Sequence, residues 1–367
     1  MEWSSVVNLK KSFFSEKEQT LAVFGNLNAS TFLYSSGVHA LRITNDHGNI
    51  VMLPYQGQQI WSCSFLGRDL TMKSIFSQPV ATREFLETYG GFLLHCGAAA
   101  SMGVPSERDN HPLHGELPNA PYQDAYIKIG QDEIGRFMGL GGRYHHMVAC
   151  SHNYLAEPSI KVYEDSTIIH SSMEITNLKK TDMELMYLMH VNFRPVDGSR
   201  LVYSAHCQPE DVKVHMDIPS EMGLTPAAER LADFIKQLTE NPGLHDVLET
   251  DQIYDPEIVF TIKYKADEKG NSYSLQIHPD GYASYLSHRP SEFKYGLRWI
   301  SRTRAEDALG LALPSTAEHK GYLAEKEKGN IEIIPPGGKA VFNVKAGLLK
   351  PPEVEDISKR ISKILSL

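Results

Sequence analysis

The stretch DMELMYLMHVNFRP, residues 182–195, predicts a β-strand whose two faces differ. Side chains alternate between the faces of a strand, and one face of this stretch is apolar at every second position. The other face turns polar only toward its C-terminal end, at His190, Asn192 and Arg194. A lone histidine is more often a core residue bonded to a backbone carbonyl. Here three hydrogen-bonding groups share one face, and burying them costs free energy unless they are paired, so we expect this face to be functional.

The chain around this strand has the pattern of an antiparallel β protein. Between Leu21 and Phe65, short apolar runs alternate with turn residues, and the segment 45–49 (NDHGN) predicts a hairpin. A helical insertion is expected near 225–248, where Thr225 can cap the helix, and a short helix at the C-terminal segment VEDISKRISKIL. Strands this short and closely spaced favour a mostly antiparallel β fold over a βαβ fold. We expect one large β domain over residues 1–367.

The composition excludes several classes of partner. A formal net charge of -9 and a pI of about 6.0 argue against nucleic acid or an anionic membrane. No window approaches the roughly 18 uninterrupted apolar residues that a membrane span needs. Charges near the N-terminus stand where a signal peptide has its apolar core, and the four cysteines form no C-x-x-C motif. We therefore expect a cytoplasmic protein with reduced thiols.

The segment HPLHGELPNAPY, residues 111–122, predicts a rigid loop, because proline fixes φ and glycine bends where other residues cannot. Stiff loops that hold ionisable groups are frequent places for functional sites, and this loop carries His111, His114 and Glu116. The histidine spacing matches no zinc or iron motif, so no metal is expected. A metal-dependent isomerase that uses His111, His114 and His190 is the weaker alternative.

Arg298 and Trp299 lie together on a later predicted strand, and Glu318 lies in the loop that follows the next one. Tryptophan beside arginine is a common lining of sugar sites, since the ring stacks on C–H faces and the guanidinium donates to hydroxyl groups. The same pair is equally common in a sheet core with a buried arginine stem. Glu318 is either a site carboxylate or a solvated loop residue.

These segments, in this order, resemble the aldose 1-epimerase (galactose mutarotase-like) superfamily over about residues 90–348. GGFLLHCG and PLHGELPNAPY are similar to the family's Gly-Gly strand and L-H-G loop, and MYLMHVNFRP is similar to the strand of its second histidine. The closing segment LALPSTAE…GYLAEKEKGN…PPGGKAVFNVKAGLL is similar to the one that holds the family's catalytic carboxylate. The deoxyribose mutarotase-like branch is the most similar one to the segments HPLHGELPNAP, HVNFRPVDG and RWISRT. The resemblance implies a large antiparallel β-sandwich.

The resemblance also implies a mechanism, in which general acid/base groups open and reclose the hemiacetal of a free sugar. No cofactor is needed. His190 would be the general acid, and His114 would bind the sugar near its ring oxygen. Where many relatives read G-L-E-P, this chain reads Ala312-Leu313-Pro314 without a carboxylate. Glu318 is therefore the substitute candidate for the base, and Glu116 is the reserve.

The expected partner is a small-molecule sugar, with 2-deoxyribose as one candidate, and the resemblance leaves room for a homodimer. The residues expected to bind the sugar are Glu116, Asn192, Arg194, Arg298 and Trp299. The missing carboxylate at Leu313 keeps a second hypothesis open, a non-catalytic carbohydrate-binding protein of the same fold. The two hypotheses differ in whether the protein accelerates exchange between anomers.

Overall fold

Two antiparallel sheets make up most of the computed structural model, which describes residues 2–99, 101–215, 226–250, 252 and 254–366. The nine-stranded sheet has the order β1 (Trp3–Asn8), β9 (Asp124–Gln131), β10 (Arg136–Val148), β11 (His152–Tyr163), β12 (Ile168–Asn177), β22 (Lys339–Leu349), β18 (Ala283–His288), β17 (Ser272–Ile277) and β14 (Arg200–Tyr203).

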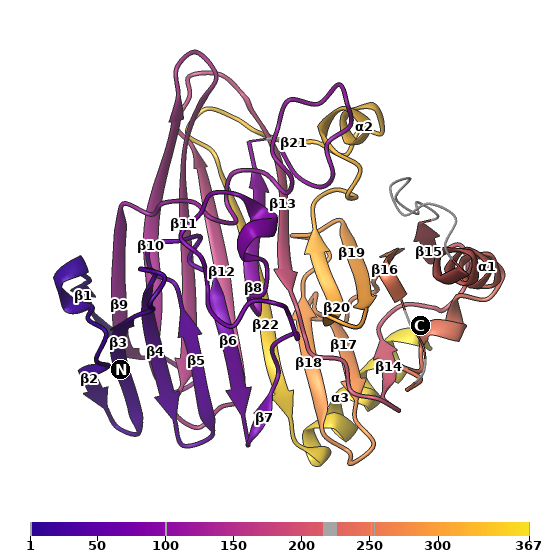
Figure 1. The fold of residues 1–367 in the computed structure, drawn as a ribbon, viewed down its shortest axis with the longest axis horizontal. Coiled ribbons are helices and arrows are strands. Elements are labelled where there is room, and N and C mark those ends of the chain that lie inside the picture. The colour runs from indigo at the N-terminus through magenta and orange to yellow at the C-terminus, as the bar shows by residue number, and fades with distance from the viewer. Residues whose placement is uncertain (1, 100, 216–225, 251, 253, 367) are drawn as a thin grey trace.

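The thirteen-stranded sheet carries the strand of His190 near its middle (Figure 1). Its order is β15 (Val212–His215), β16 (Tyr254–Ile262), β19 (Tyr295–Arg302), β20 (Asp307–Ser315), β13 (Met183–Val191), β8 (Leu93–Ala98), β6 (Ile60–Phe65), β5 (Gly48–Met52), β4 (His39–Asn45), β3 (Leu27–Leu33) and β2 (Gln19–Phe24). Two short strands extend it, β21 (Glu332–Ile334) beside β13 and β7 (Arg68–Asp69) beside β6. The predicted mostly β, antiparallel sandwich is confirmed.

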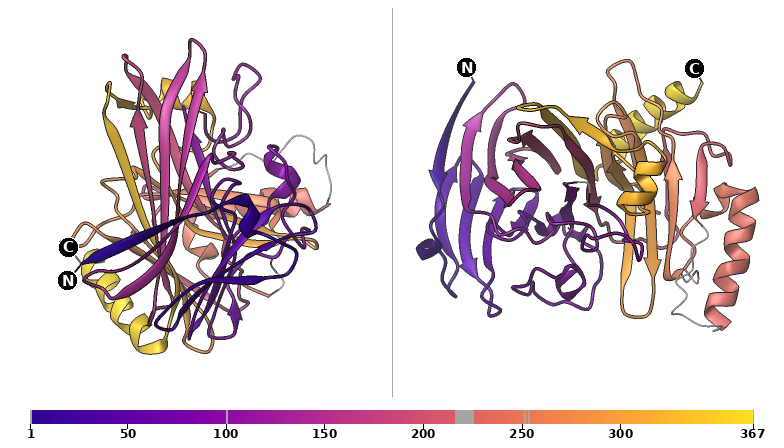
Figure 2. Two further views of the ribbon diagram at one scale, coloured as in Figure 1. Left: turned by 90° about the vertical axis from the view of Figure 1, so that its left-hand side faces the viewer. Right: turned by 90° about the horizontal axis from the view of Figure 1, so that it is seen from above.

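The helices are few. They are α1 (Pro226–Glu240), α2 (Tyr322–Glu327) and α3 (Pro351–Leu365), with the 3₁₀ turns η1 (Lys11–Phe13), η2 (Phe85–Thr88) and η4 (Pro242–His245). The predicted helix near 225–248 is confirmed as α1 followed by η4, although its proposed cap Thr225 lies outside the described residues. The C-terminal helix is confirmed as α3. Figure 2 shows α1 and α3 at the end of the molecule opposite the N-terminal strands. In the described part of the chain, no helix is long and apolar enough to cross a membrane.

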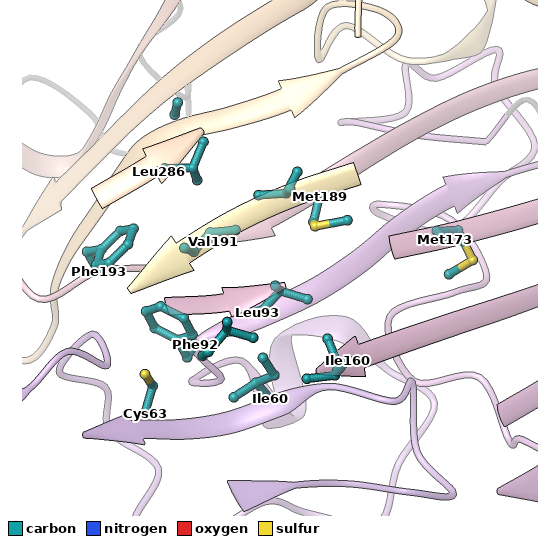
Figure 3. Close-up of a cluster of buried hydrophobic side chains, with 14 of the residues drawn as sticks. Ile60, Cys63, Phe92, Leu93, Ile160, Met173, Met189, Val191, Phe193 and Leu286 are labelled. Atoms are coloured by element: carbon teal, nitrogen blue, oxygen red, sulfur yellow. The ribbon is translucent and has the colours of Figure 1, made fainter. Parts of the chain in front are cut away.

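The main core lies between the two sheets, and the apolar face of β13 points into it. Tyr187, Met189 and Val191 on this face are fully buried. Figure 3 shows side chains of both sheets meeting there, among them Ile60, Leu93, Met189 and Val191 from the larger sheet and Ile160, Met173 and Leu286 from the smaller one. The alternation seen in the sequence thus assigns one face of β13 to the core and leaves the other face for different neighbours.

A second, smaller apolar cluster covers that other face of the larger sheet. Strand residues such as Leu188 and Trp299 contribute to it, together with Tyr89, Met102 and Ala317 from three connecting segments. These segments run over the sheet between β7 and β8, between β8 and β9, and after β20. Loops therefore cover the face of the sheet that carries His190, and polar groups on this face can contact loop residues outside the main core.

Candidate active site

His190 and Asn192 form the most tightly held part of the site. Both side chains are buried, with exposures of 4% and 0%. His190 Nδ1 lies 2.6 Å from Asn192 Oδ1, and Asn192 Nδ2 donates to the carbonyl oxygen of Gly91 at 3.0 Å. The backbone N–H of Asn192 also donates to the carbonyl oxygen of Phe92 at 2.7 Å. The end of β13 and the Gly-Gly segment beside it thus fix the orientation of the His190 ring.

Aromatic rings surround the free edge of His190. Its ring centroid lies 5.4 Å from that of Trp299 and 5.8 Å from that of Tyr89, both in edge-to-face arrangements. The Tyr89 hydroxyl lies 3.4 Å from His190 Nε2 and also 3.4 Å from Asn192 Oδ1. These contacts are long for hydrogen bonds with a hydroxyl donor, so they hold the Tyr89 hydroxyl weakly. Burial lowers the pKa of His190 to about 4, although the bond with Asn192 offsets part of this effect.

His114 meets His190 across this face, although 76 positions separate them in the sequence (190 − 114). The two ring centroids lie 5.7 Å apart with nearly perpendicular planes, and Phe85 packs against His114 at 4.7 Å. His114 is partly exposed, but its Nδ1 is buried without a hydrogen-bond partner in the described part of the chain. Burial and the neighbouring His190 lower the pKa of His114. Both imidazoles are therefore uncharged at neutral pH.

The backbone around His114 adopts a conformation that most residues avoid. His114 has φ 57° and Gly115 has φ 79°, both in the left-handed region. A Cβ on Gly115 would lie 2.0 Å from the carbonyl oxygen of Ser101, so only glycine fits there. The N–H of His114 donates to the carbonyl of Gly103, and its own carbonyl accepts from the N–H of Gly97. The L-H-G turn is thus held by β8 and by the segment that follows β8.

Glu116 anchors this loop through three hydrogen bonds to its carboxylate. Its carboxylate accepts hydrogen bonds from the Ala99 N–H at 2.9 Å, from Ser101 Oγ at 2.5 Å and from the Tyr154 hydroxyl at 2.5 Å. Tyr154 is fully buried on β11 of the other sheet. The carboxylate therefore ties the loop to the segment that follows β8 and to the smaller sheet, so its contacts are those of a residue that positions the loop.

Glu318, the sequence-based candidate for the base, has both carboxylate oxygens engaged. Oε1 accepts from Thr261 Oγ1 at 2.8 Å, and Oε2 accepts from Lys328 Nζ at 2.9 Å. Burial acts to raise the pKa of Glu318, but these two donors outweigh it and the pKa lies below its ordinary value. A carboxylate stabilised in this way is a weaker base. No measured contact of Glu318 in the described chain is with His190 or His114.

Glu257 is a carboxyl group beside the histidine and aromatic cluster. It lies near the start of β16, and its Oε2 accepts from Trp299 Nε1 at 2.6 Å. Trp299 in turn packs on His190 and Tyr89. Burial raises the pKa of Glu257, and the indole donor opposes only part of that shift. Glu257 is thus a partly buried carboxyl group with raised proton affinity, next to the two residues that surround His190.

The two arginines expected to bind sugar lie elsewhere. Arg194 donates to the carbonyl of Thr71 at 3.0 Å and pairs with Asp69 at 2.9 Å near the surface. Arg298 is fully buried on the opposite face of β19 from Trp299 and contacts His245 Nε2 at 2.7 Å. The structure thus brings together His114, His190, Asn192 and Trp299 from the predicted set, and leaves Glu116, Glu318, Arg194 and Arg298 in other surroundings.

Sequence reasoning missed Tyr89, Glu257 and His319. Glu257, Val259 and Thr261 alternate along β16 on the face of Trp299, so the reasoning applied to residues 182–195 could have found Glu257. His319 lies close enough to lower the pKa of His114, and its Nδ1 is buried without a partner among the described residues. Tyr89 follows η2 in an irregular segment, where no periodic signal marks it.

No group of three or more His, Cys, Asp or Glu side chains in the described ranges is arranged to hold a metal ion. His111, part of the weaker metal-based alternative, is used in loop contacts. Its Nδ1 lies 2.9 Å from the carbonyl oxygen of Pro112, and its Nε2 accepts from the N–H of Tyr322 at 3.3 Å.

Solved structures of other proteins share this architecture. A putative aldose 1-epimerase from Klebsiella pneumoniae matches with a TM-score of 0.81 at 14% identity, over 99% of this chain and 96% of that chain. A galactose 1-epimerase from Lactobacillus acidophilus matches with a TM-score of 0.51 at 10% identity, over 95% and 99% of the two chains. A galactose mutarotase-like protein from Lactobacillus casei matches with a TM-score of 0.50 at 11% identity, over 84% and 99%. The fold is therefore galactose mutarotase-like, as the resemblance implied.

Comparison of the sequence itself gives a family. No curated protein matches it. A family model described as a domain of unknown function, DUF4432, matches residues 35–348, which include the two strands and the loop that carry His190, Trp299 and His114. Because the match covers most of the chain and all of the candidate site, the chain belongs to the DUF4432 family and has the galactose mutarotase-like fold.

Proposed function

We propose that this protein interconverts the anomers of a free aldose by acid/base opening and reclosure of the hemiacetal, with 2-deoxyribose as the first sugar to test. The meeting of His114 and His190, with ring centroids 5.7 Å apart, is the observation that carries the proposal. An indole and a partly buried carboxyl group complete the cluster. The fold shared with a galactose 1-epimerase, at 10% identity, supports the same reaction class.

The reaction needs two proton-exchanging groups on opposite sides of the anomeric carbon. One takes the proton of the anomeric hydroxyl, and the other gives a proton to the ring oxygen as the C–O bond breaks. Rotation about the C1–C2 bond and reclosure on the other carbonyl face give the second anomer. His190 is one such group, since its Nε2 edge faces the cluster and its ring is fixed by Asn192. His114 is placed to bind the ring oxygen, and Trp299 offers an apolar ring beside it.

We propose Glu257 as the carboxyl partner of His190, in place of Glu318. Glu257 has one bonded oxygen, from Trp299, and burial raises its pKa toward the range useful for proton exchange. Glu318 is bonded at both oxygens, and its pKa is lowered. Glu257→Gln should therefore slow exchange by about 100-fold or more, which is typical for loss of a general acid or base. Glu318→Gln should slow it much less.

The direct test is anomer exchange followed by NMR at equilibrium, across 2-deoxyribose and a panel of pentoses and hexoses. The wild-type protein should accelerate exchange for at least one sugar, and His190→Ala should remove most of the acceleration. His47→Ala, in the hairpin between β4 and β5, is a matched control that changes a histidine far from the cluster. Uncatalysed rates for every sugar, with folded wild-type protein, would refute the proposal.

A non-catalytic carbohydrate-binding protein is the second candidate. It is favoured by the engaged state of Glu318 and by the 8% exposure of Tyr89, whose hydroxyl covers His190 Nε2. This candidate predicts that a sugar raises the melting temperature or changes tryptophan fluorescence without accelerating exchange. Trp299, as part of the cluster, would report such binding, and Trp299→Phe should abolish the fluorescence change.

A further inference from the structure

The orientation of one buried amide determines which nitrogen of His190 carries its proton. Asn192 Nδ2 donates to the carbonyl oxygen of Gly91 at 3.0 Å, and Oδ1 lies 2.6 Å from His190 Nδ1. Turning the amide around would place two oxygens, Oδ1 and the Gly91 carbonyl, against each other with no proton between them. An amide oxygen only accepts hydrogen bonds, so His190 Nδ1 must be the donor. Neutral His190 therefore carries its proton on Nδ1.

The other nitrogen, Nε2, is then free to accept a proton. Burial keeps His190 neutral near pH 7, and a neutral imidazole holds one proton only. The groups that face the ring are the Tyr89 hydroxyl, the Trp299 indole and the neutral His114, and none of them brings a negative charge that would favour a doubly protonated ring. In this state Nε2 can take a proton from a substrate hydroxyl and has none to give.

A proton taken up by either His190 or Glu257 can sit in two places. It can sit on His190, which leaves a charged imidazolium and a charged carboxylate, or on Glu257, which leaves both groups neutral. Both arrangements contain the same number of protons. Burial penalises charge, and it lowers the proton affinity of His190 while it raises that of Glu257. Of these two arrangements, the one with the proton on Glu257 is therefore favoured.

We propose that Asn192 is a positioning residue that fixes the Nδ1–H tautomer of His190, so that His190 Nε2 takes the proton of the anomeric hydroxyl while Glu257, in its protonated form, gives its proton to the ring oxygen. The O1–H bond breaks as N–H forms, and the C1–O5 electron pair moves to O5, which gains the proton of Glu257. C1 and O1 become the aldehyde carbonyl. Reclosure returns the first proton from His190 to O1 and the second from O5 to Glu257. These roles are the reverse of those implied by the family resemblance, and the assignment rests on the proposed anomerase function.

The first measurement needs no sugar, so its failure can be told apart from failure of the proposed function. In protein labelled with ¹⁵N-histidine, NMR at neutral pH should show His190 protonated at Nδ1 and unprotonated at Nε2, with the signals assigned by their loss in His190→Gln. A proton on His190 Nε2 in the wild-type protein, alone or together with one on Nδ1, would overturn the inference whatever the anomer exchange rates are.

Two Asn192 variants separate a positioning role from a merely structural one. Asn192→Asp keeps an acceptor next to Nδ1 and should keep the Nδ1–H signal, and its negative charge favours a second proton on Nε2. Asn192→Ala removes the acceptor, so the proton should redistribute to Nε2, and kcat for anomer exchange should fall about 100-fold with a small change in KM. Asn192→Ala with an unchanged His190 tautomer would overturn the inference. If Asn192→Ala does not fold, the wild-type spectrum decides, because a proton on His190 Nε2 in that spectrum contradicts the inference.

Discussion

Glu116→Ala should cost the folded chain about 3 kcal/mol, because three donors lose one carboxylate. The Tyr154 hydroxyl is fully buried, so its loss of a charged acceptor leaves an unpaired buried donor, at a cost of about 2 kcal/mol. The Ser101 hydroxyl can rotate to another acceptor, and Glu116 is partly exposed, so water can reach the Ala99 N–H. We assign about 1 kcal/mol to these two bonds together.

A double-mutant cycle tests this distribution of free energy. Urea unfolding of Glu116→Ala, Tyr154→Phe and the double variant should give a coupling of about 1–2 kcal/mol between the two residues. Glu107→Ala, at an exposed glutamate of the same connecting segment, should unfold like the wild type within about 0.5 kcal/mol. Additive effects of Glu116→Ala and Tyr154→Phe, within about 0.3 kcal/mol, would refute the idea that the carboxylate ties the loop to β11.

Three further perturbations follow from the same structure. Gly115→Ala should destabilise the fold by more than about 1 kcal/mol and slow anomer exchange, since its Cβ would meet the Ser101 carbonyl oxygen at 2.0 Å; wild-type values of both would contradict this. Arg298→Ala should cost about 3 kcal/mol or more in urea unfolding, because it leaves His245 Nε2 and the Leu311 carbonyl oxygen without their donor beside a cavity. A loss below about 1 kcal/mol would show that Arg298 is dispensable. The unfolding free energy should fall as pH drops from 6.5 to 4, because His190 has a folded pKa of about 4 and takes up its proton later than it does in the unfolded chain. His190→Gln should reduce the total fall over this interval by up to about 3 kcal/mol. An unchanged fall in His190→Gln would contradict the assignment to His190.

The sequence was informative wherever side chains alternate on a regular strand. The two faces of residues 182–195 predicted the strand, the core side of β13 and the polar pair His190 and Asn192 on the other side. The same rule cannot say how far a polar face extends: Arg194 lies beyond the end of β13 and pairs with Asp69 near the surface. The single domain over residues 1–367 and the cytoplasmic location stay predictions.

Local sequence patterns did not predict the contacts between segments that are distant in the chain. Arg298 and Trp299 are neighbours in sequence, yet the alternation of β19 sends the arginine into the interior and the indole toward His190. Glu318 was chosen because its place in the chain resembles that of the family base. Its actual partners, Thr261 and Lys328, come from β16 and from the residue after α2, and no spacing along the chain indicates them.

The division of the candidate site between strands and loops follows what each part has to do. Proton exchange needs a fixed donor and acceptor, and β13 and β19 supply His190 and Trp299 from a sheet whose hydrogen-bonded neighbours resist displacement. Substrate access needs segments that can move, and the groups that cover His190 come from connecting segments. The Tyr89 hydroxyl lies 3.4 Å from His190 Nε2, whereas Asn192 Oδ1 lies 2.6 Å from His190 Nδ1. A sugar that reaches His190 Nε2 must displace the Tyr89 hydroxyl, and it exchanges two weak contacts for its own hydroxyl at the same nitrogen. The hydroxyl contacts of Tyr89 are therefore the weaker ones at this nitrogen, while the shorter bond between Asn192 and His190 Nδ1 holds the tautomer of His190.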